Sequence, residues 1–288
     1  MPAFFNQATL SYNDITTTSN IVQGDYTPQL TISRNSTNAV YCSDDRITMV
    51  ISIVNSCSNA CSNLTLTDNL GAYSHSSGTL VPLSYEEGSL QVYANGVLQP
   101  EPQVQAGPPL LVSGLNVPAG GNLLVLYTAR VNAYAPLGNG ASITGTASLS
   151  GGCLAAPISA ESVIETSCGA RLTISKSICP ASITCNDPVS YTLTIQNSGS
   201  TPAVAADNVI ITDVFSPVLD IEQVMFNGAT WQTPSNYSYN AATGVFTTNA
   251  GQITVPAASY SQNMSTGEWT ISPGTATLTI TGRIAGDI

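Results

Sequence analysis

Apolar and polar residues alternate along most of this chain. The alternation is clearest over residues 47–55, 189–197 and 277–284, where every second residue is apolar. A period of two is typical of a β-strand with one buried face. No stretch keeps a 3.6-residue apolar period, and the 23 glycines and 17 prolines recur too often for long helices. The pattern predicts an all-β chain.

The strand pattern occurs twice in the same order. Asn95-Gly96 and Asn227-Gly228, which are strong signals for a tight hairpin turn, lie at matching places. Short strands at this spacing predict two tandem antiparallel β-sandwiches of the immunoglobulin-like, Greek-key kind. We assign them to residues 27–167 and 168–288. The matching segments are 30–34 and 172–176, 41–55 and 184–197, 66–69 and 211–214, 92–96 and 224–228, and 124–131 and 277–284.

The first residues match a passage in the middle of the chain. Residues 4–11 resemble residues 143–150, which close the first repeat before the second begins. At the N-terminus the same passage has no earlier repeat to close, and the second repeat reaches 278–284 without closing strands. We therefore interpret residues 1–26 as a donor strand and connector that completes a second repeat.

Two destinations are open to this donor segment: the second repeat of its own chain or that of a neighbouring subunit. The connector is short, and the second repeat lies beyond the first, roughly 40 Å or more away. We therefore expect insertion into a neighbour, which gives an open head-to-tail filament. A frayed terminus is the alternative. The side chains expected to make the contact are Phe4, Phe5, Asn6, Ala8, Leu10 and Tyr12.

Charge is scarce and acidic. Only 8% of the 288 residues are charged, and the net charge is −11 with six basic residues, which excludes a phosphate-binding face for nucleic acid. The start lacks the basic and apolar regions of a signal peptide. No apolar run reaches the ~18 residues of a membrane span. Lysine and histidine occur once each, at Lys176 and His75, so few of the side chains that usually serve in catalysis are present.

Seven cysteines are many for a reducing cytosol and favour an extracellular protein. Short sequence separations favour local disulfides, with one cysteine left for a bond between chains. Free buried thiols are the alternative, and the irregular spacing does not fit zinc. The expected pairs are Cys57 with Cys61, Cys153 with Cys168 and Cys179 with Cys185, which leaves Cys42.

Each repeat resembles the conserved-repeat domain of bacterial surface proteins known as domain of unknown function 11. The resemblance rests on a first strand with a basic residue, an alternating strand ending in Asn, a Thr-Asp before a loop, a strand with Asn-Gly, and a late alternating strand. It implies a β-sandwich used as a stalk or surface module, without known catalysis. The chain departs from the family because the closing Asn-x-Ala-Thr strand, residues 6–9, stands at the opposite end.

A covalent bond between subunits is a further expectation. The first strands of the repeats carry Arg34 and Lys176, and the closing strands carry Gly145 and Asn6. Lysine and asparagine form self-made isopeptide bonds in the Gram-positive pilin and adhesin sandwiches that this fold resembles. That chemistry needs a desolvated lysine and a nearby carboxyl, for which Asp213 is the candidate. The alternative is a solvated lysine and an asparagine that bonds to a turn.

Other groupings of polar residues do not predict an enzyme. His75 lies in a turn-like loop, and the adjacent Glu86 and Glu87 point to opposite faces of a strand. The pair Asp44-Asp45 lacks the spaced acidic loop of a calcium site. We expect no cofactor and no metal site.

These patterns predict a structural subunit of a self-assembling fibre on a bacterial cell or spore surface, whose partner is another copy of itself. The alternative is a monomeric surface adhesin or carbohydrate-binding module with a ligand held near Trp231 and the Tyr237–Tyr239 loop; Trp269 is a second candidate for sugar stacking. The two hypotheses differ in one respect that is simple to measure: the fibre subunit polymerises without ligand, and the adhesin stays monomeric.

Overall fold

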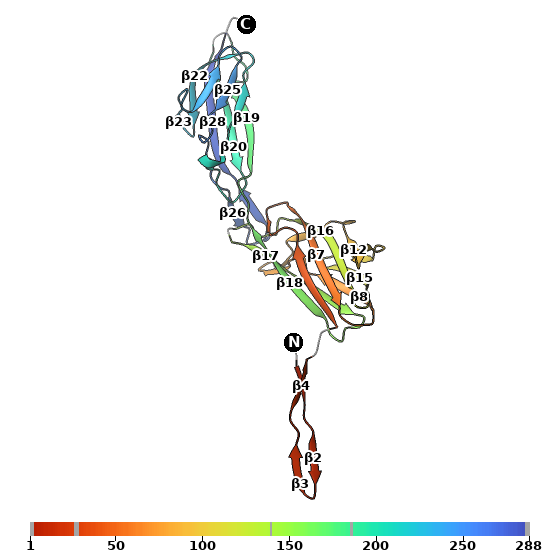
Figure 1. Cartoon of the computed structure of the whole chain (residues 1–288). Coiled ribbons are helices and arrows are strands. Elements are labelled where there is room, and N and C mark those ends of the chain that lie inside the picture. The colour runs from red at the N-terminus through yellow and green to blue at the C-terminus, as the bar shows by residue number, and fades with distance from the viewer. Residues whose placement is uncertain (1–2, 26–28, 139, 185–186, 286–288) are drawn as a thin grey trace.

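A computed structural model describes residues 3–25, 29–138, 140–184 and 187–285. The chain forms an N-terminal hairpin, a first β-domain and a second β-domain, arranged one after the other along the molecule (Figure 1). The only helix among the described residues is a single 3-10 turn, Ala205–Asp207. The prediction of an all-β fold with two sandwiches is therefore confirmed.

Domain one, from β5 to β18, consists of two packed sheets. All strand pairs are antiparallel except β6 with β18. A small hairpin, β9 (Tyr73–His75) and β10 (Gly78–Leu80), leaves the sandwich at the end near domain two. The first sheet has the order β13 (Val97–Leu98), β12 (Gln91–Ala94), β16 (Asn122–Val131), β7 (Arg46–Asn55), β5 (Leu30–Ser36), with β11 (Leu83–Tyr85) also paired to β16. The second has the order β14 (Gln103–Gln105), β15 (Leu110–Val117), β8 (Cys61–Asp68), β17 (Ser142–Gly151), β18 (Ile158–Thr166), β6 (Val40–Tyr41).

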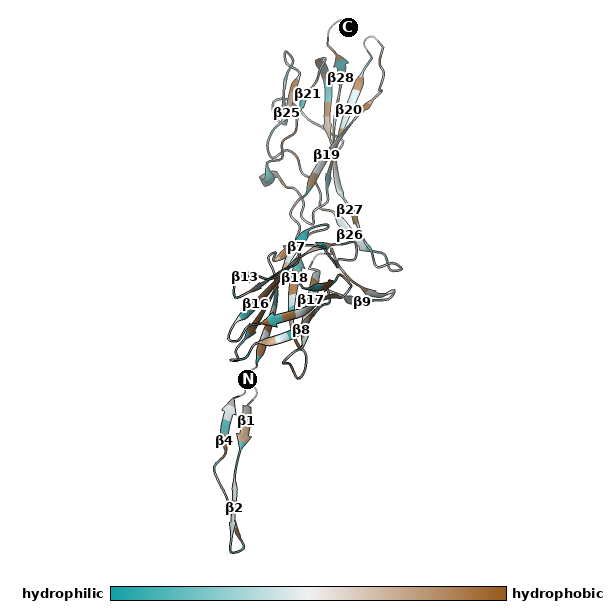
Figure 2. Ribbon diagram, turned by 90° about the vertical axis from the view of Figure 1, so that its right-hand side faces the viewer, coloured by the Kyte–Doolittle hydropathy of each residue, from teal (hydrophilic) through white to brown (hydrophobic). Residues whose placement is uncertain are grey.

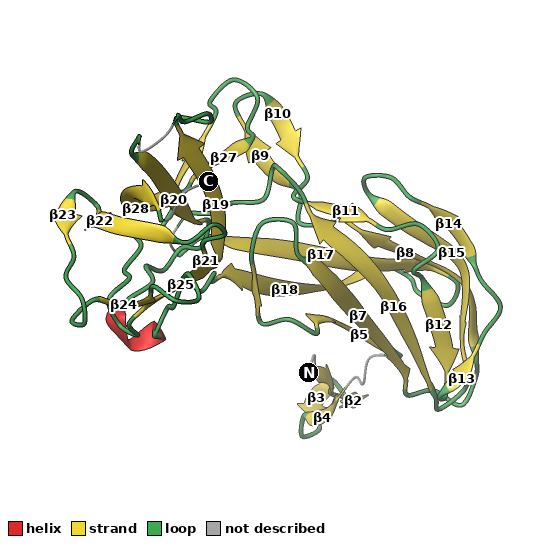
Figure 3. Ribbon diagram, turned by 90° about the horizontal axis from the view of Figure 1, so that it is seen from above, coloured by secondary structure: helices red, strands yellow, loops and turns green. Residues whose placement is uncertain are grey.

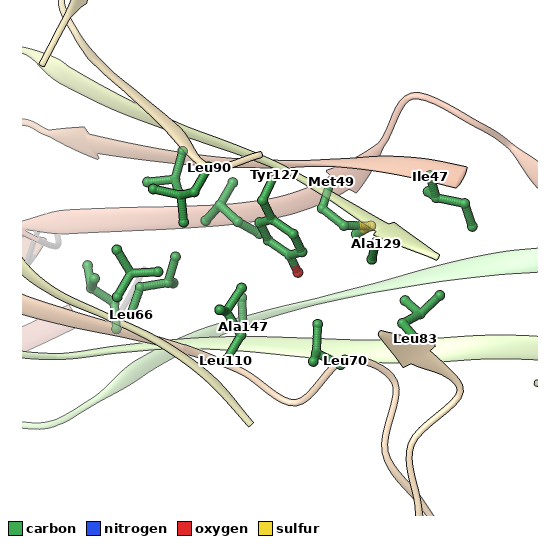
Figure 4. Packing of buried hydrophobic residues seen from close by; sticks show 14 of the residues in the cluster. Ile47, Met49, Leu66, Leu70, Leu83, Leu90, Leu110, Tyr127, Ala129 and Ala147 are labelled. Carbon is green, nitrogen blue, oxygen red and sulfur yellow. The ribbon is translucent and has the colours of Figure 1, made fainter. Parts of the chain in front are cut away.

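The core of domain one lies between these two sheets. Alternate residues of β7 and β16, such as Met49 and Ala129, are fully buried, as the period of two predicts. Figure 4 shows Tyr127 reaching from one sheet toward Ala147 and Leu110 of the other. Each such apolar side chain contributes about 1.5–3 kcal/mol when it is removed from water.

Domain two, from β19 to β28, repeats this plan with fewer strands. Its five-stranded sheet corresponds to the first sheet of domain one, and its three-stranded sheet corresponds to β8, β15 and β14. Among the described residues, domain two has no counterpart of β17 and β18. The larger sheet has the order β19 (Leu172–Cys179), β20 (Val189–Asn197), β28 (Gly274–Ile284), β22 (Leu219–Phe226), β23 (Ala229–Thr230). The smaller has the order β21 (Thr212–Val214), β25 (Val245–Thr248), β24 (Tyr237–Asn240), and β26 (Ser259–Gln262) pairs with β27 (Trp269–Ser272).

The two domains share an asparagine side chain that bonds to two loop carbonyls and a tight Asn-Gly turn, both at matching places in the sequence repeat. Asn55 at the end of β7 donates to the carbonyls of Asn59 and Pro118, and Asn197 at the end of β20 donates in the same way to Thr201 and Pro256. Both predicted Asn-Gly turns form with positive φ at both residues, as a tight hairpin turn requires.

The N-terminal hairpin comprises residues 3–25. It pairs β1 (Ala3–Asn6) with β4 (Val22–Asp25) and β2 (Thr9–Tyr12) with β3 (Ile15–Thr18). Asn13 and Asp14 make its turn with positive φ angles. The hairpin projects from domain one away from domain two, and apolar residues of β1 stay uncovered (Figures 1 and 2).

The disulfides differ from the sequence prediction. Cys42 bonds to Cys168 and Cys61 bonds to Cys153, each with 5.5 Å between the Cα atoms. The expected pairs of Cys57 with Cys61 and Cys153 with Cys168 are therefore wrong, and Cys42 is not left for another chain.

The sandwich explains the difference, because it brings together strands whose cysteines lie 126 and 92 residues apart. Among the described residues, Cys57 and Cys179 carry free thiols. The predicted bond of Cys179 with Cys185 involves a residue outside the described part of the chain.

Candidate functional site

Domain two is open along one side. Its short edge strand β21 pairs with β25, and no described strand lies on its other side. In domain one the corresponding strand β8 pairs with both β15 and β17. Strand β21 therefore presents an edge of the kind that pairs with an added strand.

The facing strand β19 is open on the same side. Its inward row, Ile174, Lys176 and Ile178, is exposed, with Ile174 at 55% and Ile178 at 44%. The corresponding row of β5 is covered, and Arg34 is 2% exposed. Domain two thus has an uncovered face between β19 and β21, with exposed apolar side chains, where domain one has a filled interior; we call this face the groove.

In domain one the hairpin β17–β18 fills this space. Ile143, Gly145, Ala147 and Leu149 of β17 alternate inward and are buried. Strand β18 adds inward residues opposite them, including Ser162 opposite Gly145. The hairpin extends the sheet beyond β8 and covers β5.

An ion pair lies beneath this hairpin. The Arg34 guanidinium donates from Nε to Asp68 Oδ2 over 2.9 Å and from Nη1 to Ser162 Oγ over 2.6 Å. Both charged side chains are fully buried. Burial lowers the pKa of Arg34, but the Asp68 carboxylate and then Tyr127 together outweigh this effect, and the net pKa is raised. Burial, and then the charge of Asp68, raises the pKa of the neighbouring Tyr127.

The equivalent site in domain two holds a lysine. Lys176 Nζ lies 2.5 Å from Asp213 Oδ2, 4.6 Å from the centroid of the Tyr191 ring and 5.0 Å from that of Phe215. The two side chains are 37% and 14% exposed, because no hairpin covers them. The backbone N–H of Val214 donates to Asp213 Oδ1 and holds the carboxylate beside the lysine.

The β1–β4 half of the N-terminal hairpin is paired as β17–β18 is, and the β2–β3 half is shifted by one residue. Asn6 pairs with Val22 where Gly145 pairs with Ser162, and Phe4 pairs with Gly24 where Ile143 pairs with Ile164. The Phe4 ring lies over Gly24, where any side chain would collide with it. The exposed large apolar side chains of this hairpin are Phe4, Phe5, Leu10, Tyr12, Ile15, Ile21 and Val22.

The structure brings together two of the three residues predicted for the isopeptide. Lys176 and Asp213 are in contact, and Asn6 lies in the hairpin at the far end of the chain. Sequence reasoning missed the rings of Tyr191 and Phe215 beside the lysine. Tyr191 lies on the inward row of a predicted strand, but the sequence gives no signal for Phe215, because a loop positions it.

The ligand site of the adhesin hypothesis is not present on the surface. Trp231 stacks on Phe226, and Tyr237 stacks on Phe246. Trp231 and Tyr237 are each only 8% exposed, so they belong to the core of domain two. Trp269 packs against the core of domain one. Sequence could not separate this role from sugar stacking, since aromatic residues serve both.

Within the described ranges, no group of three metal-ligating side chains is close enough to hold an ion. No helix in that part of the chain has the length and apolar character needed to cross a membrane.

No protein-family model matches this chain, and no curated protein matches it. Solved structures with distant similarity include the major pilin BcpA of Bacillus cereus, at 12% identity over 94% of this chain and 73% of that chain, with a TM-score of 0.37. The pilus backbone RrgB of Streptococcus pneumoniae has 10% identity over 85% of this chain and 55% of its own, with a TM-score of 0.33. A family 123 glycoside hydrolase from Clostridium perfringens has 11% identity over 48% of this chain and 27% of its own, with a TM-score of 0.29. The chain thus spans about half or less of the last two, and similarities this distant identify no function.

Proposed function

We propose that this chain is a structural subunit of a fibre that assembles head to tail. The N-terminal hairpin of one subunit fills the open groove of domain two in its neighbour. One observation carries the proposal: the β1–β4 half of the hairpin that stands free at one end of the molecule is paired as in the hairpin β17–β18, for which the described part of domain two has no counterpart. Ladder hydrogen bonds to β21 and burial of apolar side chains on both partners supply the affinity.

Domain one supplies the register of the proposed contact. There Ala147 of β17 pairs with Asp68 of β8, and Leu149 pairs with Leu66. Transferred to the junction, Ala8 pairs with Asp213 and Leu10 with Ile211. Even-numbered residues of the donor then face the groove. Phe5 takes the outward place of exposed Thr144, which revises its expected role as a contact residue.

The position of the hairpin favours a neighbouring subunit over the same chain. The hairpin precedes β5 in the chain and lies at the end of domain one remote from domain two. Domain one therefore stands between the hairpin and its own groove (Figure 1). Insertion into another copy avoids this distance and repeats the connection that already joins the two domains.

We further propose that an isopeptide bond locks the junction. In this register Asn6 takes the place of Gly145, where an added Cβ would lie 2.5 Å from Arg34 Nη1. Such a separation is too short for atoms in simple contact. It is close to the separation of about 2.4 Å between the two atoms that flank the carbonyl carbon of an amide. A lysine nitrogen at this place is therefore positioned to bond to the Asn6 side chain.

The bond follows from amide exchange. The neutral Nζ of Lys176 attacks Cγ of Asn6, the Nζ–Cγ bond forms, the Cγ–Nδ2 bond breaks, and ammonia leaves with a proton from Nζ. Protonated Asp213 donates a hydrogen bond to the amide oxygen during the attack and keeps its proton when ammonia has left. Insertion of the hairpin excludes water, which favours the neutral forms of an amine and a carboxyl. The rings of Tyr191 and Phe215 contribute to this exclusion.

Electron microscopy tests the assembly. Negative-stain images of the full chain are compared with those of a version that lacks residues 1–24. We expect filaments from the first and monomers from the second, and an added peptide of residues 1–26 should cap growing filaments. Monomers from both versions contradict the proposal.

Denaturing gels test the crosslink separately. Boiled and reduced fibres should run as a ladder of multimers, and each junction should have lost the mass of one ammonia. Fibres of Asn6→Ala should run as a single monomer band, while those of the outward control Gln7→Ala keep the ladder. A single monomer band from unaltered fibres contradicts the crosslink but leaves the assembly intact.

We place the fibre outside the cell, on a bacterial cell or spore surface. Two disulfides among the described residues favour an oxidising compartment. A low content of charge and abundant small polar residues suit an extended surface protein.

A further inference from the structure

The joint between the two domains of one subunit is fastened by a disulfide and an ion pair. Cys168 in the linker bonds to Cys42 at the end of domain one. Arg171, three residues later, donates from Nη2 to Asp45 Oδ1 over 2.7 Å and from Nη1 to the carbonyl of Ser43. The linker is thus held to domain one at two points before β19 begins.

Two hairpins fasten the same joint on its other side. The β26–β27 hairpin of domain two lies against the β9–β10 hairpin of domain one (Figure 3). The backbone N–H of Trp269 donates to the carbonyl of Ala133 over 2.7 Å, and the indole ring of Trp269 packs on the core of domain one. Gln262 donates to the Tyr73 hydroxyl over 3.2 Å, and Ser76 to the carbonyl of Met264.

The proposed joint between subunits lacks the residues of the disulfide and the ion pair. Position 26, four residues before Leu30 as Cys168 is four before Leu172, is a tyrosine in the sequence, so no cysteine stands there to pair. The residues that correspond to Arg171 and Asp45 are Gln29 and Asp187; without the arginine they form no ion pair.

Neither hairpin has a counterpart at that joint. In domain one, β15 connects to β16 through residues 118–121 alone, in the place where domain two inserts β26–β27. In domain two, β21 connects to β22 through residues 215–218, in the place where domain one inserts β9–β10. Both insertions lie at the ends that meet within the subunit, and both are missing from the ends that meet between subunits.

We infer that each subunit is a rigid two-domain rod and that the fibre bends at the joint between subunits. This inference rests on the proposed function. The crosslink and the donor hairpin resist pulling, because they join the partners through β-strands, but the disulfide, the ion pair and the hairpin contacts that fix the orientation of the two domains within a subunit have no equivalent there. The fibre therefore combines strength along its axis with one hinge per subunit.

Images of intact fibres test the inference. Successive domains are traced in electron micrographs, and the angle between neighbours is measured at alternating joints. We expect a narrow distribution at one joint and a distribution at least twice as wide at the next. Equal, narrow distributions at both joints contradict the inferred hinge between subunits but do not contradict the proposed assembly. If no fibres form, the proposed assembly fails as well.

A variant keeps the test sharp. Cys42→Ser and Cys168→Ser together with Arg171→Ala, Gln262→Ala and Trp269→Ala remove most side-chain contacts that fasten the joint within the subunit, and they should widen the narrow distribution toward that of the other joint. The matched control, Cys61→Ser with Cys153→Ser, removes a disulfide inside domain one and should leave both distributions unchanged. An unchanged narrow joint in the first variant overturns the assigned cause of rigidity.

Discussion

Arg34 and Lys176 occupy the same place in two copies of one fold, and their neighbours differ accordingly. Arginine donates to Asp68 and Ser162 at once, and its planar fork fills the space beneath Gly145. A side chain at Gly145 would collide with it. The lysine ammonium is a compact charge, and the nitrogen becomes nucleophilic when it loses its proton. Gly145 leaves room for the buried ion pair of Arg34 with Asp68. In the proposed junction, Asn6 instead brings an amide to the nitrogen of Lys176, with which it can react.

This contrast predicts that the crosslink can be moved into domain one. In the double variant Arg34→Lys and Gly145→Asn, the carboxyl of Asp68 is already in place and fully buried. We expect an isopeptide bond within one chain, seen by mass spectrometry as the loss of one ammonia from a version that lacks residues 1–24. Each single variant serves as a control and should keep its full mass. A double variant that folds and keeps its full mass contradicts the geometric argument for the crosslink.

At the scale of elements, the open groove explains the truncated second sheet. Strand β21 has three residues, whereas its counterpart β8, with neighbours on both sides, has eight. Strand β19 keeps its ladder with β20 but is exposed over nearly its whole length. Both features follow from the space that a paired hairpin occupies in domain one.

The register of the donor predicts which hairpin residues matter. Leu10 takes the place of Leu149, which is fully buried, and Phe5 takes the place of exposed Thr144. Leu10→Asp places a charge in the groove at a cost of about 3 kcal/mol, so the concentration needed for polymerisation should rise about 100-fold. Phe5→Asp adds the same charge outside and should change it little. Sedimentation of polymer measures both, and equal effects contradict this register.

Strands could be predicted from the sequence because their signals are local. The alternation over 47–55 and 189–197 is confirmed in β7 and β20, and both Asn-Gly turns form as expected. The cysteine pairs could not be predicted, because Cys42 meets Cys168 only after the sheets pack. Phe215 lies on Lys176 for the same reason, since a loop brings it there. Contacts between residues far apart in the chain depend on the order in which the strands pack, and this order cannot be read from a single sequence.

At the scale of the whole molecule, the distribution of charge shows that electrostatic attraction between subunits does not drive assembly. The chain carries a net charge of −11, and residues 1–26 contribute two aspartates and no basic residue. Among the described residues of β19 and β21, which bound the groove, the one cation is Lys176, and Asp213 already pairs with it. The free ends of two subunits therefore meet through apolar surface while the molecules as a whole repel each other.

Salt should consequently speed polymerisation. Screening shortens the reach of the repulsion from about 30 Å at 0.01 M to about 8 Å at 0.15 M ionic strength, while contact between the hairpin and the groove buries apolar surface that salt does not weaken. Light scattering at neutral pH should show faster growth across this range. Leu10→Asp, which raises the repulsion at the contact itself, should show a steeper salt dependence than Phe5→Asp. Growth that slows as salt is added would mean that opposite charges draw the subunits together, and the apolar account of the junction would then be wrong.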